Sequence, residues 1–355
     1  MQLDSLLTII LRIFESYGNS DEAGIHCSNC PTRVPQSRSH CRFTVRSDDK
    51  AQQIVANNPE FTSLLEAAIV PDIAAKGAYD EALRDDSLDA VVHTASPFFT
   101  DVTDPQLLLR PAVEGTLNLL HAVAKFAPRV KRVIITSSFA AMINESKGNW
   151  PGHEYNEDDW NPITDQQALS GGIVTYRASK TFAERAAWNF VADKKPSFDL
   201  VTLNPPMVYG PIINTQRLSA LNESSQRFWK FLSGQMKEIP TSSSPLWVDV
   251  RDVAAAHLAA YEKPAAGGKR FFIVADEWYS NQDIADIFRK HFPEVRDKVP
   301  EGTPGRGFHL KPEEIYTHNN SRSKEILGIT YRSFETCATD AGRSILELAK
   351  AENAL

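Results

Sequence analysis

Ser138, Tyr176 and Lys180 have the types and the spacing that carbonyl reduction requires. Tyr176 and Lys180 lie four positions apart, a spacing that puts two side chains on one face of a helix. A phenol with a pKa near ~10 exchanges protons poorly at neutral pH unless a nearby cation stabilises its phenolate. Ser138 precedes the tyrosine by 38 positions, and its hydroxyl can hold a carbonyl. The three residues therefore predict a proton donor, a group that tunes its pKa and a carbonyl anchor.

Each of these residues also has an ordinary interpretation. A Tyr-x-x-x-Lys pair is most often a surface tyrosine over a solvated lysine. Ser138 alone is equally consistent with a serine that caps a turn after a strand. Ser137 is a competing hydroxyl, because neighbouring side chains of a strand point to opposite faces. The surrounding elements are therefore needed to decide between the catalytic and the ordinary interpretation of these residues.

The surrounding pattern predicts a Rossmann-like, doubly wound α/β fold with a parallel sheet. Short β-branched runs alternate with helical stretches from Ala67 onward, which is typical of βαβ units. Their near-continuous apolar character suits strands that are covered on both faces. Ligands of such sheets bind beyond the carboxyl ends of the strands, which is where Ser138 would lie. The expected strands are residues 68–70, 90–92, 133–136 and 200–203.

The expected helices fall into two groups. One helix from about 174 to 190 would carry the Tyr176/Lys180 pair, with Phe182, Ala186 and Ala187 toward the core and Glu184 and Arg185 toward water. A second helix is expected over 105–126. After Pro211 the rhythm changes, and helices are expected at 224–232, 281–291 and 334–351.

Composition excludes several classes of protein. A net charge of −7 over 355 residues leaves no basic surface for nucleic acid or anionic membrane. Four cysteines are too few for a disulfide framework and favour a reducing compartment. The run Leu6 to Phe14 is too short for a membrane helix, and Asp4 and Arg12 make it a poor signal peptide. We expect a cytoplasmic protein that binds neither nucleic acid nor membrane.

Several segments, in this order, resemble the extended short-chain dehydrogenase/reductase family. The likeness is to its dihydroflavonol-reductase-like branch and especially to NADPH-dependent methylglyoxal and aldehyde/ketone reductases. It runs from about Arg42 to the C-terminus. The segments are Thr44 to Lys50, Val70 to Ile73, Asp89 to Pro97, Pro111 to Thr116, Arg132 to Ser138, Tyr176 to Lys180, Leu203 to Pro211 and Val248 to His257.

The resemblance implies an NADPH-dependent carbonyl reductase with Ser138, Tyr176 and Lys180 as catalytic residues. The family's spacing favours Ser138 over Ser137. Tyr176 would donate the proton, while Lys180 would lower its pKa and bind the nicotinamide ribose. The implied substrate is an aldehyde or ketone, either a small dicarbonyl or a polyketide ketone of secondary metabolism. The apolar wall of its pocket would come from Phe98, Phe99, Phe139 and Met207.

The resemblance also implies a cofactor site for NADP(H), to which Tyr176 and Lys180 contribute. Arg46 and Lys50 would bind the 2′-phosphate, because guanidinium and ammonium groups pair with phosphate. Asp48 and Asp49 lie between them, so a solvated charged loop is the alternative.

Further along the chain, the resemblance implies that Asp72 contacts the adenine amino group of the cofactor. Pro205 would lie beside the nicotinamide. His93 is interpreted as a buried core histidine without a chemical role, and Asp249 and Arg251 as structural charges.

Residues 1–41 do not match the family. The glycine-rich turn that holds the pyrophosphate at a helix N-terminus has no counterpart, since Gly18 and Gly24 are the only glycines ahead of Arg42. We expect residues 6–14 to form an amphipathic helix, the sheet to be short where the first βαβ unit belongs, and NADPH binding to be weak. A divergent extension or, as we favour, a mis-spliced gene model would explain the mismatch.

The cysteines of this segment raise the question of a zinc site. Cys27 and Cys30 have suitable spacing, but adjacent His40 and Cys41 fit a tetrahedron poorly, so no metal is expected.

The sequence thus predicts three parts: an atypical segment 1–41, an NADP-binding core 42–210, and a mainly substrate-binding lobe 211–355 with some segments returning to the core. Two other functions stay open. One is epimerisation or dehydration of a nucleotide sugar, and the other is a non-catalytic binding protein that has lost cofactor turnover. The natural carbonyl compound and the oligomeric state are not predicted.

Overall fold

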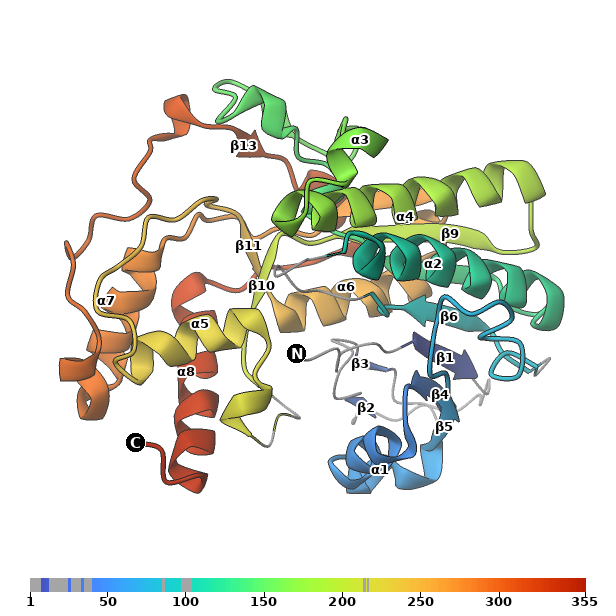
Figure 1. Cartoon of the computed structure of the whole chain (residues 1–355), viewed down its shortest axis with the longest axis horizontal. Coiled ribbons are helices and arrows are strands. Elements are labelled where there is room, and N and C mark those ends of the chain that lie inside the picture. The colour runs from blue at the N-terminus through green and yellow to red at the C-terminus, as the bar shows by residue number, and fades with distance from the viewer. Residues whose placement is uncertain are drawn as a thin grey trace.

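A computed structural model describes residues 8–12, 25–26, 33–34, 40–84, 87–96, 104–212, 215 and 217–355. Within these residues a seven-stranded sheet forms the centre of the molecule (Figure 1). Its order is β12 (Lys269–Phe272), β9 (Asp199–Asn204), β7 (Arg132–Thr136), β6 (Ala90–His93), β1 (Thr8–Arg12), β4 (His40–Val45) and β5 (Leu65–Ile69). Every neighbouring pair is parallel except those that β1 makes with β4 and β6.

Helices cover both faces of this sheet, as the apolar strands predict. α2 (Gln106–Phe126) and α4 (Gly172–Lys194) lie side by side on one face (Figure 1). α1 (Asp48–Ala56) and α6 (Val250–Glu262) cover the other. Alternation along β6 serves both layers, because Val91 packs with α2 and α4 whereas Val92 packs with α1 and α6. The predicted Rossmann-like α/β fold is confirmed.

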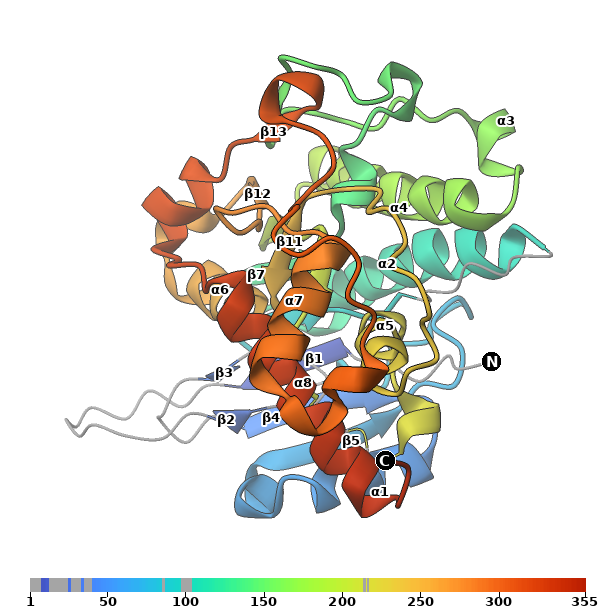
Figure 2. The ribbon, with the colours of Figure 1, turned by 90° about the vertical axis from the view of Figure 1, so that its left-hand side faces the viewer.

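Three further helices build a smaller lobe around an aromatic core. They are α5 (Glu223–Leu232), α7 (Asn281–His291) and α8 (Phe334–Ala351), and Figure 2 shows α7 and α8 side by side. Phe228, Phe288 and Phe334 share this core with Trp247. The lobe is joined to the sheet through the parallel pair β10 (Met207–Tyr209) and β11 (Trp247–Asp249).

Short elements complete the described fold. The pair β8 (Glu154–Tyr155) and β13 (Thr317–His318) is parallel, whereas β2 (Ile25–His26) and β3 (Arg33–Val34) are antiparallel. α3 (Asp165–Ala168) precedes α4. In the part of the chain that the structure describes, no helix combines the length and the apolar character needed to cross a membrane.

The structure corrects the expectation for the N-terminal segment. Residues 8–12 form strand β1 and not an amphipathic helix, and the sheet is not short at this position, because β1 fills the place between β4 and β6. Backbone N–H and C=O groups of two buried strands need partners along their facing edges. The run Thr8-Ile-Ile10 is β-branched and therefore suits a strand. Long-range pairing overrides the local helical pattern.

Asp249 and Arg251 have the structural role expected of them. The buried Asp249 caps α6 by accepting a hydrogen bond from the backbone of Arg251 at 2.8 Å. The Arg251 side chain pairs with Asp249 and with Asp340 of α8, both at 2.7 Å. These contacts tie the sheet-covering helix to the smaller lobe.

Candidate active site

The predicted site residues gather at one edge of the sheet. Because β4, β5, β6, β7 and β9 run parallel to one another, their carboxyl ends meet at the same edge. Arg46 directly follows β4, and Ser138 comes two residues after β7. Pro205 directly follows β9. Asp72 lies three residues beyond β5. This is the edge where open α/β sheets bind ligands.

Ser138 is held by the turn that follows β7. Its side chain is 9% exposed, and its Oγ accepts a hydrogen bond from the backbone N–H of Ala140 at 3.1 Å. The serine therefore caps the short 3-10 helix Phe139–Ala141. It also shares a hydrogen bond with the Tyr176 hydroxyl. The turn-capping interpretation is confirmed, and the same side chain has the contact with Tyr176 that the substrate-anchor interpretation requires.

Ser137 points away from this contact. Its Oγ donates a hydrogen bond to the Glu184 carboxylate at 2.6 Å in the protein interior. Strand alternation separates the two serines, so Ser138 is the one that meets the tyrosine.

Tyr176 and Lys180 lie one turn apart on α4, both half-buried. The Lys180 ammonium lies 6.0 Å from the centre of the Tyr176 ring. Burial raises the pKa of Tyr176 to about 12, which outweighs the lowering by the hydrogen bond with Ser138, and Glu223 raises it further. The net shift is thus opposite to the lowering that the sequence suggested. The phenol keeps its proton at neutral pH, as a proton donor must.

Both Lys180 and His93 have lowered pKa values, and the charge of Lys180 contributes to the shift of His93. Burial lowers the pKa of Lys180 to about 8. Burial, and then the charge of Lys180, lowers the pKa of His93 to about 3. His93 is 2% exposed and meets the edge of Tyr79, with ring centres 6.2 Å apart. It is a neutral core histidine, in agreement with the interpretation of the sequence.

Arg46 and Lys50 lie where β4 passes into α1. Ser47 caps that helix through the backbone N–H of Lys50, at 3.4 Å. The Lys50 ammonium donates to Gln53 at 3.2 Å, and Arg46 is half-buried. Two acidic residues, Asp48 and Asp49, are exposed on the first turn of the helix. The basic pair is therefore at the site edge, with acidic neighbours on its solvent side.

Asp72 shapes its own turn. Its Oδ1 accepts from the backbone N–H of Ala74 at 2.8 Å, and Oδ2 lies 3.8 Å from the guanidinium of Arg110. The carboxylate is exposed at the site edge, next to a cation on α2.

The expected apolar wall is only partly supported. The Phe139 ring is buried in the core and stacked on Phe272, with ring centres 5.2 Å apart. Met207 is half-buried on β10. Phe98 and Phe99 lie outside the described residues. Phe139 nevertheless has a role, because its backbone N–H donates to the carbonyl of Pro205 at 2.8 Å and joins the two site loops.

The first strand runs the wrong way for a family cofactor site. Thr8 pairs with Thr44 and His93 at the site edge, whereas Arg12 pairs with His40 at the opposite edge. The chain that leaves β1 therefore starts from the edge away from the site. In a parallel first strand it would emerge where the pyrophosphate is held.

The strand β4 also bears on the zinc question. Cys41 is buried and His40 is exposed, so these neighbours point to opposite sides of the sheet. Cys27 and Cys30 lie outside the described residues. The described part of the chain contains no cluster of three or more metal-binding side chains.

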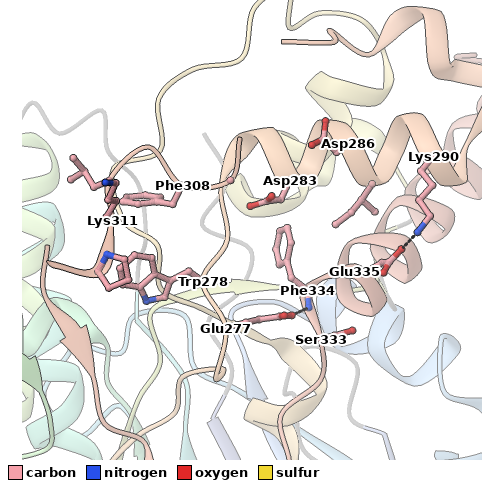
Figure 3. A pocket seen from close by; sticks show the side chains of 14 residues that line it. Glu277, Trp278, Asp283, Asp286, Lys290, Phe308, Lys311, Ser333, Phe334 and Glu335 are labelled. Carbon is pink, nitrogen blue, oxygen red and sulfur yellow. Dashed lines mark hydrogen bonds and ion pairs between the residues drawn. The ribbon is translucent and has the colours of Figure 1, made fainter. Parts of the chain in front are cut away.

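A separate cavity of about 700 Å³ lies in the smaller lobe (Figure 3). It is lined by residues of α7, the start of α8 and the loop around Phe308, and none of the predicted site residues contributes to it. Several charged side chains that line the cavity already have partners within the protein. Lys290 pairs with Glu335 at 2.6 Å, and Asp286 accepts from the backbone N–H of Gly305 at 2.7 Å. We do not assign the active site to this cavity.

Residues 42–275 match the NAD dependent epimerase/dehydratase family over about two thirds of the chain. The chain belongs to this family. A ketoreductase of Aspergillus niger is 43% identical over 334 residues, covering 92% of this chain and 96% of the relative. An NADPH-dependent methylglyoxal reductase of Saccharomyces cerevisiae is 35% identical, covering 86% and 90%.

Among solved structures of this epimerase/dehydratase family, Gre2 from Candida albicans in complex with NADPH superimposes with a TM-score of 0.79. It is 36% identical, and the match covers 86% of this chain and 90% of that one. Family membership agrees with the resemblance seen in the motifs.

The sequence interpretation missed Glu184. Expected to face water, it is 2% exposed and pairs with Arg270 of β12 at 2.7 Å. A charged residue on a helix is usually solvated, and its partner lies 86 positions away. The available signal was its position four residues beyond Lys180, which extends the Tyr176/Lys180 face by one turn.

Proposed function

We propose that the protein is an NADPH-dependent carbonyl reductase that converts an aldehyde or ketone to an alcohol. The observation that carries the proposal is the hydrogen bond between Ser138 and Tyr176, with Lys180 one turn further along α4, at the carboxyl edge of the sheet. The identity to named reductases of this family supports it. We propose Ser138, Tyr176 and Lys180 as the catalytic residues.

The roles follow from the protonation states. The hydroxyls of Ser138 and Tyr176 both donate hydrogen bonds to the substrate oxygen, which draws electron density from the carbonyl carbon. Bound NADPH supplies the hydride that this carbon accepts. Tyr176 then gives its proton to the alkoxide oxygen, and the O–H bond of the alcohol forms as the phenolate appears. The Lys180 ammonium stabilises that phenolate.

The described residues fit two ends of the cofactor. Arg46 and Lys50 supply cations for a 2′-phosphate, and the exposed Asp72 carboxylate at the same edge can accept from the adenine amino group. Lys180 and Pro205 lie at the other end, beside Tyr176 and Ser138. We propose that residues 42–210 hold the cofactor, while β12 and α6 return to the core and complete the sheet and its cover. Most of residues 211–355 then hold the substrate. We also propose that the enzyme acts in the cytoplasm.

We propose two substrate classes, small dicarbonyls and the larger ketones of polyketide-type metabolites. The experiment is to follow NADPH oxidation with a dicarbonyl, a bulky aryl ketone and a nucleotide sugar in parallel. Oxidation with one of the first two supports reduction. Turnover of the nucleotide sugar without net NADPH consumption would instead favour the epimerase alternative, and binding without any turnover would favour a non-catalytic protein.

The pH dependence of the reduction rate should follow the charge state of Lys180. Its folded-state pKa of about 8 lies below the ordinary value of ~10.4, so the ammonium is present below pH 8 and is lost above it. Reduction at saturating NADPH should therefore be constant near neutrality and fall as pH rises through 8. Tyr176, with a pKa of about 12, stays protonated across this range and cannot cause the fall.

Lys180→Met is the matched variant for this profile. Its rate should be low throughout and lack the step near pH 8, and its NADPH binding should also weaken. A variant in which only the cofactor KM changes, with the wild-type pH profile kept, would contradict the proposed role of the lysine.

NADPH binding should be weak in the chain as written. The turn after β1 starts at the wrong edge of the sheet, and a pyrophosphate needs close backbone approach with converging N–H donors. A variant with residues 1–41 replaced by the strand, glycine-rich turn and helix of a relative should bind much more tightly. Quenching of the six tryptophans measures both affinities. A dissociation constant for the chain as written below about 1 μM would contradict this prediction.

A further inference from the structure

We propose that Glu184 is a positioning residue for reduction, which holds Ser138 in register with Tyr176. The inference rests on the proposed function, because it concerns the geometry of that site. Glu184 touches neither reacting group. It lies two turns beyond Tyr176 on the same face of α4 and is almost fully buried beneath the site.

Five donors converge on the two oxygens of the Glu184 carboxylate. Its Oε2 accepts from Ser137 Oγ at 2.6 Å and from Asn204 Nδ2 at 2.7 Å. Its Oε1 accepts from the side chains of Arg270 at 2.7 Å, Thr202 at 2.9 Å and Trp188 at 3.3 Å. Apart from Trp188, which is on α4 itself, these donors come from β9, from β12 and from the residue that follows β7. The carboxylate therefore ties the catalytic helix to three neighbouring strands.

Two of these contacts act on the backbone of Ser138, one through Ser137 and the other through Asn204. Ser137 is its direct chain neighbour. Asn204 uses the same amide nitrogen to donate to the Ser138 carbonyl at 3.2 Å, so one amide group bridges that carbonyl and Glu184. A shift of the carboxylate would move residues 137 and 138 relative to α4. The hydrogen bond between Ser138 and Tyr176 depends on that separation.

Arg270 balances the buried charge. Its guanidinium donates to the backbone carbonyls of Glu157 at 2.6 Å and Asp159 at 2.7 Å, and lies over the Trp160 ring at 3.8 Å. A buried ion pair adds little net stability compared with apolar residues of similar volume, because desolvation offsets the attraction. Because the pair adds little net stability, we infer that its role is to fix the geometry of the turn that carries Ser138.

The test compares Glu184→Gln with a matched control. The glutamine keeps the shape, but its NH₂ group faces side chains that are themselves donors, so the turn must move. A displacement near 1 Å can cost ~10²-fold in rate, and we expect kcat to fall roughly 10- to 100-fold. NADPH quenching should stay close to wild type. The control Asp252→Asn alters a buried carboxylate that pairs with Arg332 on the other side of the sheet, and should keep its kcat.

A readout that does not depend on turnover separates positioning from stability. The ¹³Cζ resonance of Tyr176, assigned by its loss in Tyr176→Phe, reports the hydrogen bond to Ser138. It should shift in Glu184→Gln and stay in place in Asp252→Asn, whereas melting temperatures should fall in both. An unshifted resonance with wild-type kcat in Glu184→Gln would overturn the inference, and so would an equal loss of kcat in the control.

A milder variant keeps the proposal falsifiable if Glu184→Gln does not fold. Ser137→Ala removes one hydrogen bond to the charged carboxylate and leaves the Arg270 ion pair in place. It should lower kcat and shift the same resonance in the same direction, and an unchanged kcat and resonance would overturn the inference. If the wild-type chain reduces no aldehyde or ketone with NADPH, the proposed function itself fails. If it does so and the Glu184 and Ser137 variants keep wild-type kcat, the positioning role alone fails.

Discussion

Tyr176→Phe should lower the rate of carbonyl reduction by ~10²–10⁴-fold, the usual contribution of general acid catalysis. The phenylalanine keeps the ring in place over Lys180 and removes only the hydroxyl that contacts Ser138. The alkoxide then lacks its proton donor, so kcat and kcat/KM should fall together. NADPH affinity should change little, because the ring and the lysine remain. Steady-state NADPH oxidation and tryptophan quenching measure the two effects on the same preparations.

Tyr155→Phe is the matched control for this variant. Tyr155 is also buried, and burial raises its pKa to about 12. Its hydroxyl accepts from the backbone N–H of Asn144 at 2.9 Å and has no proposed role in catalysis. This substitution should preserve kcat. Activity in Tyr176→Phe within a factor of about two of wild type would rule out the tyrosine as the proton donor.

The second large effect should come from Arg46→Ala combined with Lys50→Ala. Charge-assisted contacts to a phosphate are each worth about 1.5–3 kcal/mol, which corresponds to roughly ten- to hundred-fold in affinity. The double variant should lose its preference for NADPH and bind NADPH and NADH with similar affinity. Affinity for NADH should barely change, because NADH lacks the 2′-phosphate. The ratio of kcat/KM for the two cofactors is the quantity to measure.

A double variant that changes net charge equally gives the control. Lys131 and Lys194 are exposed, and Lys131 lies at the start of β7, at the opposite edge of the sheet. Replacing both by alanine removes two positive charges without touching the site edge. The cofactor preference should survive there. A preference that persists equally in the Arg46/Lys50 variant would show that another part of the chain binds the 2′-phosphate.

Local sequence patterns predict the helices and the buried strands well. The expected helices 281–291 and 334–351 agree with the structure at both ends, because apolar periodicity and capping serines at Ser280 and Ser333 mark them. The helix that carries Tyr176 begins two residues earlier and ends four residues later than expected. The choice of Ser138, Tyr176 and Lys180 depends on the family resemblance, because local patterns alone leave Ser137 and the ordinary interpretations open. The structure puts the serine after a strand and the other two residues on one helix.

Contacts between distant segments explain the errors. Residues 8–12 carry an apolar pattern that fits either a helix or a strand, and only the open place between β4 and β6 decides for the strand. Glu184 looks solvated until Arg270 of β12 is placed beside it. Phe139 looks like a pocket residue because it follows Ser138, yet its ring packs into the core against Phe272. None of these partners is close in the sequence.

The most direct test of the account is the fate of the hydride. The wild-type chain would be incubated with a reactive ketone and NADPH that carries deuterium at the transferred position of the nicotinamide, and the alcohol would be analysed by mass spectrometry. The account predicts an alcohol with deuterium on the former carbonyl carbon, in an amount equal to the NADPH oxidised, and formed ~10²–10⁴-fold more slowly by Tyr176→Phe. An unlabelled alcohol, or NADPH binding with no alcohol from any ketone or aldehyde, would contradict it.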